Sequence, residues 1–134
     1  MDDVLLTKIL RSTHTIASVG LSSNPSKESY QIVAYLKSHG YRIIPVNPTA
    51  VEILGEKAYP DLSSIGQKID VVQVFRPSED VPPVVKDAIQ IGAKVVWMQV
   101  GISNAEAAKT AEEAGLEVVM DHCMRAEHRR LIGA

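Results

Sequence analysis

Four segments rich in Val and Ile each lead into a residue that could hold a ligand. These residues are Gly20, Asn47, Arg76 and Gln99. Glycine allows a ligand to approach the backbone closely, and amide and guanidinium groups donate hydrogen bonds to phosphate oxygens. Together they favour binding of a phosphate-bearing cofactor over hydrolytic chemistry.

The elements that must position these residues alternate along the chain. We expect strands at 16–19, 42–46, 70–75, 94–98 and 117–120, and helices at 4–11, 29–38, 81–91, 104–114 and 125–131. Such alternation indicates βαβ units, a parallel sheet and right-handed crossovers that cover both faces. The sequence therefore predicts one α/β domain over 1–134, a three-layer α/β/α Rossmann-like fold with a five-stranded, mainly parallel sheet. Segment 58–66, A-Y-P-D-L-S-S-I-G, is expected to form one or two short helical turns.

Composition limits the classes of function. The 134 residues are 46% hydrophobic and 22% charged, which is ordinary for one soluble domain. The net charge of -2 argues against a nucleic-acid partner, which needs a basic face. No run reaches the roughly 20 apolar residues of a membrane helix, and the single cysteine, Cys123, suits a reducing compartment. We expect a cytoplasmic protein without a membrane partner.

The first loop departs from the dinucleotide-binding fingerprint G-x-G-x-x-G. Gly20 keeps the first position, Ser22 occupies the second, and a proline stands at the third. We expect the amides of Ser26, Lys27 and Glu28 to face an anion at a helix N-terminus. The alternative is that Ser26 is a simple N-cap and Lys27 a solvated side chain.

The second strand ends in Asn47 and Pro48, where NAD-binding proteins usually place a carboxylate. A neutral amide tolerates a nearby phosphate, so the expected ligand carries a phosphate near its ribose or is not NAD. The alternative is that N-P merely starts a turn.

The third and fourth strands end in groups that suit a nucleotide. Phe75 and Arg76 can flank a purine and contact a phosphate, although Phe75 could equally belong to the core. Gln99 is followed by Gly101, which again permits close backbone approach.

Six motifs resemble the small CoA-binding proteins, which are stand-alone versions of the CoA-binding domain of the succinyl-CoA synthetase α subunit. They are G-L-S-x-x-P-x-K-x-S-Y, I-P-V-N-P, L-G-E-K-A-Y-P-D-L, D-V-V-x-V-F-R-P, A-K-V-V-W-M-Q-x-G-I and V-V-M-D-x-C-x-x-x-E-H-R-R-L. The resemblance covers nearly the whole chain. It implies a Rossmann-like fold that binds coenzyme A or an acyl-CoA, with the pyrophosphate on loop 20–27. The 3′-phosphate of CoA agrees with the missing carboxylate after the second strand.

The resemblance also implies a set of site residues at the strand ends. They are Gly20, Leu21, Ser22, Ser26, Lys27, Tyr30, Asn47, Pro48, Phe75, Arg76, Gln99, Gly101, Ile102 and Cys123. One departure is His122, where the family pattern leads us to expect Arg, so a phosphate contact there would be weaker or pH-dependent.

We interpret the chain as a CoA-binding module that acts as a carrier, sensor or accessory protein without catalysis of its own. One alternative is an NADP-type oxidoreductase with Arg76 on the 2′-phosphate, which the broken glycine fingerprint disfavours. Another is an acyl-CoA-processing enzyme that uses Cys123, although adjacent Cys and His point to opposite sides of an extended segment. A third is an interaction scaffold that binds no small molecule. Cys123 is expected to be a buried small hydrophobe or to lie near the CoA thiol.

The remaining histidines and basic residues have plainer interpretations. His14 is expected to be structural and His39 exposed, and no spacing of Cys and His suggests a metal site. The E-H-R-R run at 127–130 is expected to be a solvated helix end in which Glu127 pairs locally.

Overall fold

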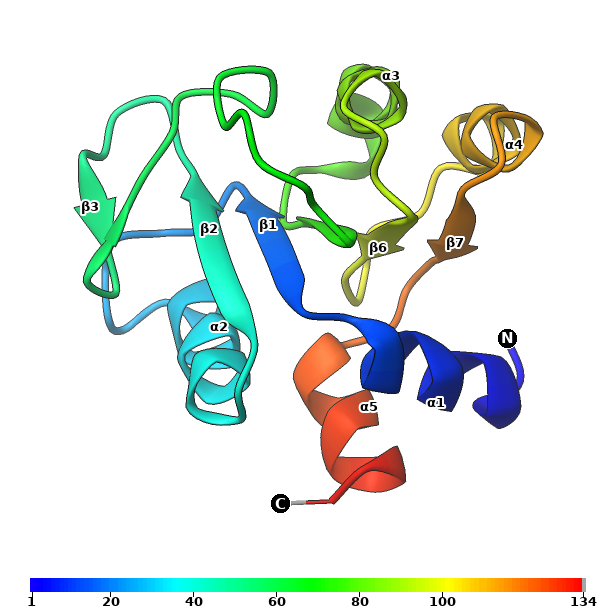
Figure 1. The fold of residues 1–134 in the computed structure, drawn as a ribbon, viewed down its shortest axis with the longest axis horizontal. Helices are drawn as coiled ribbons and strands as arrows, with labels where there is room; N and C mark the ends of the chain where they lie inside the picture. Colours follow the sequence, from blue (N-terminus) through cyan, green and yellow to red (C-terminus); the bar gives the residue numbers. More distant parts are fainter. Residues whose placement is uncertain (134) are drawn as a thin grey trace.

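A parallel sheet of five strands forms the middle layer of the protein (Figure 1). The computed structural model describes residues 1–133. The strands are β1 (Thr15–Val19), β2 (Arg42–Val46), β5 (Val71–Val74), β6 (Val95–Met98) and β7 (Glu117–Val119). Their order is β2-β1-β5-β6-β7, and every neighbouring pair is parallel. The expected sheet is confirmed, and it is parallel throughout.

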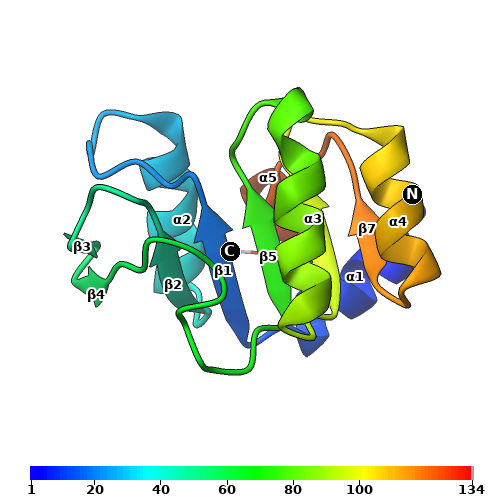
Figure 2. The ribbon, with the colours of Figure 1, turned by 90° about the horizontal axis from the view of Figure 1, so that it is seen from above.

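Helices cover both faces of this sheet. They are α1 (Asp3–Ser12), α2 (Glu28–Ser38), α3 (Val81–Gln90), α4 (Ala105–Glu113) and α5 (Met124–Leu131), with a short 3-10 turn at Ser78–Asp80. Figures 1 and 2 show α3 and α4 on one face and α1, α2 and α5 on the other. The three-layer prediction is confirmed. Within residues 1–133, no helix combines the length and the apolar character needed to cross a membrane.

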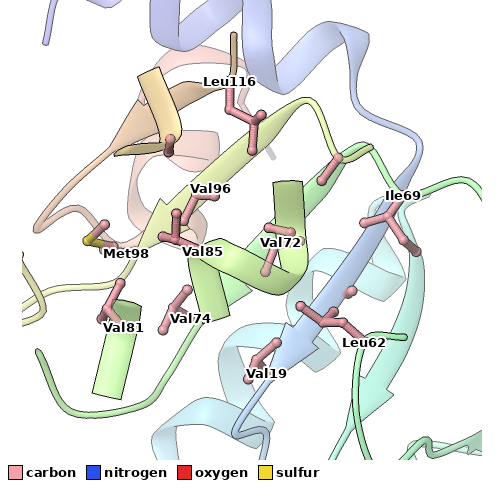
Figure 3. Close-up of a cluster of buried hydrophobic side chains, with 14 of the residues drawn as sticks. Val19, Leu62, Ile69, Val72, Val74, Val81, Val85, Val96, Met98 and Leu116 are labelled. Carbon is pink, nitrogen blue, oxygen red and sulfur yellow. The ribbon is translucent and has the colours of Figure 1, made fainter. Parts of the chain in front are cut away.

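The two faces bury two separate cores because successive residues of a strand point to opposite sides. On one side, Val72 and Val74 of β5 pack toward Val81 and Val85 of α3, as Figure 3 shows. On the other side, strand residues such as Ile16 belong to a core shared with α1, α2 and α5. Burial on both faces explains why the strands read as continuous Val- and Ile-rich runs.

The segment after β2 differs from the expectation. It forms a small antiparallel pair, β3 (Glu52–Ile53) and β4 (Glu56–Lys57), joined by Leu54 and Gly55. Both joining residues have positive φ, 55° and 74°, as a tight hairpin turn requires. The prediction of short helical turns at 58–66 is wrong, since these residues form bends and a turn.

The last helix also corrects an expectation. Arg129 and Arg130 are exposed as expected, and Arg130 pairs with Glu127. His128, however, is only 4% exposed, because α5 lies against α2 and the imidazole faces Tyr35. The prediction of a solvated helix end is therefore wrong for His128.

Candidate functional site

A cavity of about 200 Å³ lies at the carboxyl edge of the sheet, beside the start of α2. Figure 2 shows the loops that follow β1, β5 and β6 along this edge. The cavity is lined by Glu28, Ser29, Ile32, Phe75, Gln99, Val100 and Ile102. Phe75, Gln99 and Ile102 were predicted from the sequence as site residues. Ligand sites usually measure about 300–1,000 Å³, so this cavity suits one part of a cofactor rather than a whole one.

Larger hollows lie elsewhere on the surface. One of about 300 Å³ lies between α3 and α4 and is lined by residues such as Val85, Ile89 and Ala107. None of the sequence-predicted site residues lines it. In an open parallel sheet, ligands bind outside the carboxyl ends of the strands. We therefore assign the site to the smaller cavity.

The side chain of Gln99 is held in one orientation. Its Oε1 accepts hydrogen bonds from the Gln73 Nε2 at 3.2 Å and from the Met124 backbone amide at 3.1 Å. Gln73 is itself fixed, because its Oε1 accepts a hydrogen bond from the Ser18 hydroxyl at 2.8 Å. Within residues 1–133, no buried side-chain nitrogen or oxygen lacks a partner. The Gln99 Nε2 has no hydrogen-bond partner in that range, so this nitrogen keeps solvent-accessible surface. Because Gln99 lines the cavity, we infer that the Nε2 is the donor that this side chain offers there.

Sequence reasoning found Gln99 but missed the residues that orient it. Ser18 and Gln73 lie inside strands and are fully buried. The available signal was a polar residue within each Val-rich strand, since a buried polar side chain needs a partner. Ser29 and Ile32 were missed as lining residues because the sequence does not show which face of α2 meets the cavity.

Gly20 and Arg76 meet where β1 and β5 end. Gly20 has a φ of +85°, and a Cβ at this position would lie 3.0 Å from the Arg76 Cδ. The stem of Arg76 therefore packs over the Gly20 backbone. The guanidinium pairs with Asp80 at 3.2 Å, but both side chains are about half exposed. Such exposed pairs are weak, which leaves Arg76 able to bind an anion.

The first loop is stabilised by its own hydrogen bonds. The Ser22 hydroxyl accepts from the Asn24 amide, and the Asn24 Oδ1 accepts from the amide and hydroxyl of Ser26. The Lys27 amide donates to the Asn24 carbonyl. The amides of Ser26 and Lys27 are thus engaged inside the loop, contrary to our expectation that they face a ligand.

The start of α2 still offers free donors. The N-cap position is Lys27, whose exposed side chain makes no capping hydrogen bond. The interpretation of Ser26 as a simple N-cap is therefore wrong. The first amides of a helix have no partner within it, so those of Glu28, Ser29 and Tyr30 remain available at the end of α2 that borders the cavity. The Gln31 amide is the first that is engaged, since it donates to the Lys27 carbonyl.

Asn47 connects the second loop to the first. Its Nδ2 donates to the Leu21 carbonyl at 3.0 Å, and its Oδ1 accepts from the amides of Thr49 and Ala50. Asn47 thus caps a bend at 48–49, as the turn interpretation expects, and its role toward a ligand stays a prediction. Leu21 has a fully buried side chain, and the exposed Pro48 lies outside the cavity lining.

Three further expected residues do not line the cavity. Gly101 has a φ of +81°, and its amide donates to the Asp121 Oδ1 at 2.6 Å. Tyr30 and Cys123 are partly buried against the core beneath α1, α2 and α5. This placement of Cys123 agrees with its interpretation as a small hydrophobe. No cluster of His, Cys, Asp or Glu in residues 1–133 could hold a metal ion.

The fold places the chain in the class of Rossmann-like domains, and the cavity lies at the edge where open parallel sheets bind ligands. Within this class, the chain belongs to the CoA binding domain family, whose sequence model matches residues 14–129. The expected resemblance is thereby confirmed.

Individual relatives agree with this assignment. The chain is 42% identical over 121 residues to the uncharacterized protein YneT of Bacillus subtilis, covering 90% of each sequence. A hypothetical protein from Pyrococcus horikoshii has a solved structure that matches with a TM-score of 0.96 and 43% identity, covering 99% of this chain and 94% of that one.

A longer relative is the ADP-forming acetate–CoA ligase II of Archaeoglobus fulgidus. The identity is 33% over 115 residues, which cover 83% of this chain. They are only 17% of the ligase. The expected relation to succinyl-CoA synthetase holds only broadly, through ligases of this kind.

Proposed function

We propose that the protein binds coenzyme A or an acyl-CoA at the carboxyl edge of its sheet, as a carrier, sensor or accessory module without catalysis of its own. The observation that carries this proposal is the meeting of Gly20 and Arg76 between β1 and β5. Strand order reverses at this point, because β2 lies on one side of β1 and β5 on the other. Ligands of open α/β sheets bind at such switch points.

The charged part of the ligand lies over the first loop in this proposal. Helix N-termini favour phosphate groups, and the free amides at the start of α2 lie beside the cavity. Arg76, which packs over Gly20, and Lys27, at the N-cap of α2, supply positive charge. Asn47 adds no carboxylate that would repel the 3′-phosphate.

The uncharged part of the ligand enters the cavity. Phe75, Ile32 and Ile102 provide apolar walls, and the Gln99 Nε2 provides a donor. The pantetheine arm of CoA has both matching features, an apolar chain and amide carbonyls that accept hydrogen bonds. The small volume of the cavity fits such an arm better than a whole nucleotide.

Isothermal titration of the purified protein tests the proposal. CoA, dephospho-CoA, NADP and NAD are compared under reducing and non-reducing conditions. We expect CoA to bind most tightly and dephospho-CoA more weakly, because it lacks the 3′-phosphate. Binding of NADP without CoA would instead support an oxidoreductase, and binding of none of the four would support an interaction scaffold.

A Cys123→Ser variant separates simple binding from chemistry at the thiol. If Cys123 only packs against the core, the variant binds CoA as the parent protein does in both redox conditions. A covalent CoA adduct in the parent protein, detected by mass spectrometry and lost in the variant, would place the thiol at the CoA end of the site.

A further inference from the structure

Helix α5 connects the candidate site to the opposite edge of the sheet. At its first residue, the Met124 amide donates to the Gln99 Oε1 at 3.1 Å. One turn later, His128 is 4% exposed and its Nδ1 lies 2.8 Å from the Tyr35 hydroxyl of α2. One short helix therefore contacts both the residue that faces the cavity and a buried imidazole.

His128 lies in a cluster of rings and cations. Its ring is 5.1 Å from that of His39 at the end of α2 and 5.7 Å from that of Tyr41. It borders a hollow of about 310 Å³ that is also lined by Arg11 of α1 and by His14. None of the residues that line this hollow is acidic.

The charged groups of α5 do not compensate His128 either. The Arg129 guanidinium lies over the Tyr35 ring at 4.8 Å, which adds a further positive charge nearby. The acidic side chains of Glu127 and, from α1, Asp3 both bind Arg130. A protonated His128 would thus be a buried cation among cations.

Two physical effects act on this imidazole in opposite directions. Burial, and secondarily the nearby His39, lower the pKa of His128 below its ordinary value. The C-terminal ends of α1, α2 and α5 border the hollow and favour a cation, but the net direction remains downward. The folded protein therefore binds this proton less tightly than the unfolded chain. The folded protein therefore keeps its full stability above the ordinary imidazole pKa, where His128 is neutral. Protonation of His128 lowers that stability as the pH falls below this value.

We propose that protonation of His128 releases α5 from α2 and thereby weakens CoA binding at the carboxyl-edge cavity. This proposal rests on the proposed function. In the docked state, the Met124 amide and Gln73 together fix the Gln99 side chain. Release of α5 removes one of these two donors, so the Gln99 Nε2 no longer points only toward the ligand. Because coupling is reciprocal, bound CoA stabilises the docked helix.

Hydrogen exchange of the ligand-free protein tests the switch alone. Protection factors of the α5 amides, corrected for intrinsic rates, are measured between about pH 8 and about pH 5.5, where imidazoles titrate. We expect α5 to lose protection in acid while β1 and β5 keep theirs. His128→Asn, which cannot be protonated but retains an acceptor for Tyr35, should keep α5 protected. Equal loss in both proteins would overturn the switch.

Titration with CoA over the same pH range tests the coupling. The parent protein should lose at least about fivefold more affinity than His128→Asn, the lower end of ordinary coupling between sites. The 3′-phosphate of CoA itself titrates near pH 6, so the difference between the two proteins is the measure. His14→Asn, a change at an exposed histidine of the same hollow, should behave as the parent does.

The outcomes separate the two proposals. If CoA fails to bind at pH 8, the proposed function fails, and hydrogen exchange still reports on α5. If CoA binds with the same pH dependence in parent and His128→Asn, the coupling is overturned. Should His128→Asn not fold, Tyr35→Phe replaces it. Loss of the hydroxyl that bonds the neutral ring should move the release of α5 to higher pH, and an unchanged midpoint would contradict the proposal.

Discussion

The two edges of the sheet use their polar groups differently. At the amino edge, the Asp70 carboxylate accepts hydrogen bonds from the amides of His14 and Thr15, and the Tyr41 hydroxyl donates to the Leu10 carbonyl. These polar groups are used in hydrogen bonds within the protein. At the carboxyl edge, buried hydrogen bonds orient Gln99 so that one donor remains free. We infer that the amino edge stabilises the fold and the carboxyl edge binds the ligand, and substitutions at the two edges should separate stability from affinity.

Matched glycine substitutions should give the largest difference between the edges. Gly20 and Gly40 both have positive φ, +85° and +96°. An alanine at either position should cost about 1–2 kcal/mol of folding free energy through backbone strain. Only Gly20→Ala should also reduce CoA affinity, by more than about a hundredfold, because its Cβ displaces Arg76 and blocks the approach of the ligand. Chemical denaturation and calorimetry measure the two quantities.

Gly40→Ala provides the control for the effect of Gly20→Ala on CoA affinity. Gly40 has no atom within 4 Å of an added Cβ, so Gly40→Ala is the control for strain without a clash. Equal loss of CoA affinity in both variants would mean that binding simply follows stability.

Asp70→Asn should show the opposite pattern, a loss of stability without a loss of affinity. Desolvation raises the pKa of Asp70, but hydrogen bonds from Thr15 and His14, with the charge of Lys94, outweigh it and lower the pKa. Loss of the charged acceptor should cost about 2 kcal/mol near neutral pH. Urea denaturation measures this cost.

The pH dependence provides a control for Asp70→Asn. A carboxylate with a lowered folded-state pKa stabilises the protein above its ordinary pKa, and this contribution disappears as the pH falls through the folded-state value. The stability difference between parent and variant should therefore shrink in acid. A difference that is independent of pH would contradict the assigned role of the charge.

Arg76→Ala should change affinity by a smaller factor and leave stability nearly unchanged. A charge-assisted hydrogen bond contributes about 1.5 kcal/mol or more, which corresponds to at least about tenfold in the dissociation constant. Its exposed pair with Asp80 should contribute little to folding. Arg42→Ala, at the exposed amino end of β2, is the matched control and should bind CoA normally. Equal affinity in the two variants would remove Arg76 from the site.

The sequence predicts features that depend on local pattern better than features that depend on contacts between distant segments. Strand and helix positions follow from local pattern, and the observed bounds of the five sheet strands and five helices differ from the predicted ones by at most one residue. The hairpin was missed because Leu54 adopts a positive φ that its residue type disfavours. Burial of His128 was missed because it depends on α5 packing against α2, a contact between segments far apart in the sequence.

The sequence predicted only part of the candidate site, because some of its residues follow from local pattern and others depend on contacts between distant segments. Residues at strand ends, such as Phe75 and Gln99, could be found because a parallel sheet brings its strand ends to one edge. The partners of Gln99 could not be found, because Gln73 reaches it across neighbouring strands and Met124 approaches from a helix 25 residues later.

Lys94→Ala should have the smallest effect. It tests whether Asp70 stabilises the amino edge through its ion pair with Lys94 or through its hydrogen bonds to backbone amides. The Lys94 Nζ lies 3.5 Å from Asp70, but the lysine side chain is 59% exposed. Solvent screens such a pair, so its loss should cost no more than about 0.5 kcal/mol, well below the cost of Asp70→Asn. Urea denaturation of the single variants and the double variant measures the coupling between the two side chains. A coupling near the full cost of Asp70→Asn would show that the ion pair stabilises this edge, whereas a small one assigns the stability to the backbone amides of His14 and Thr15.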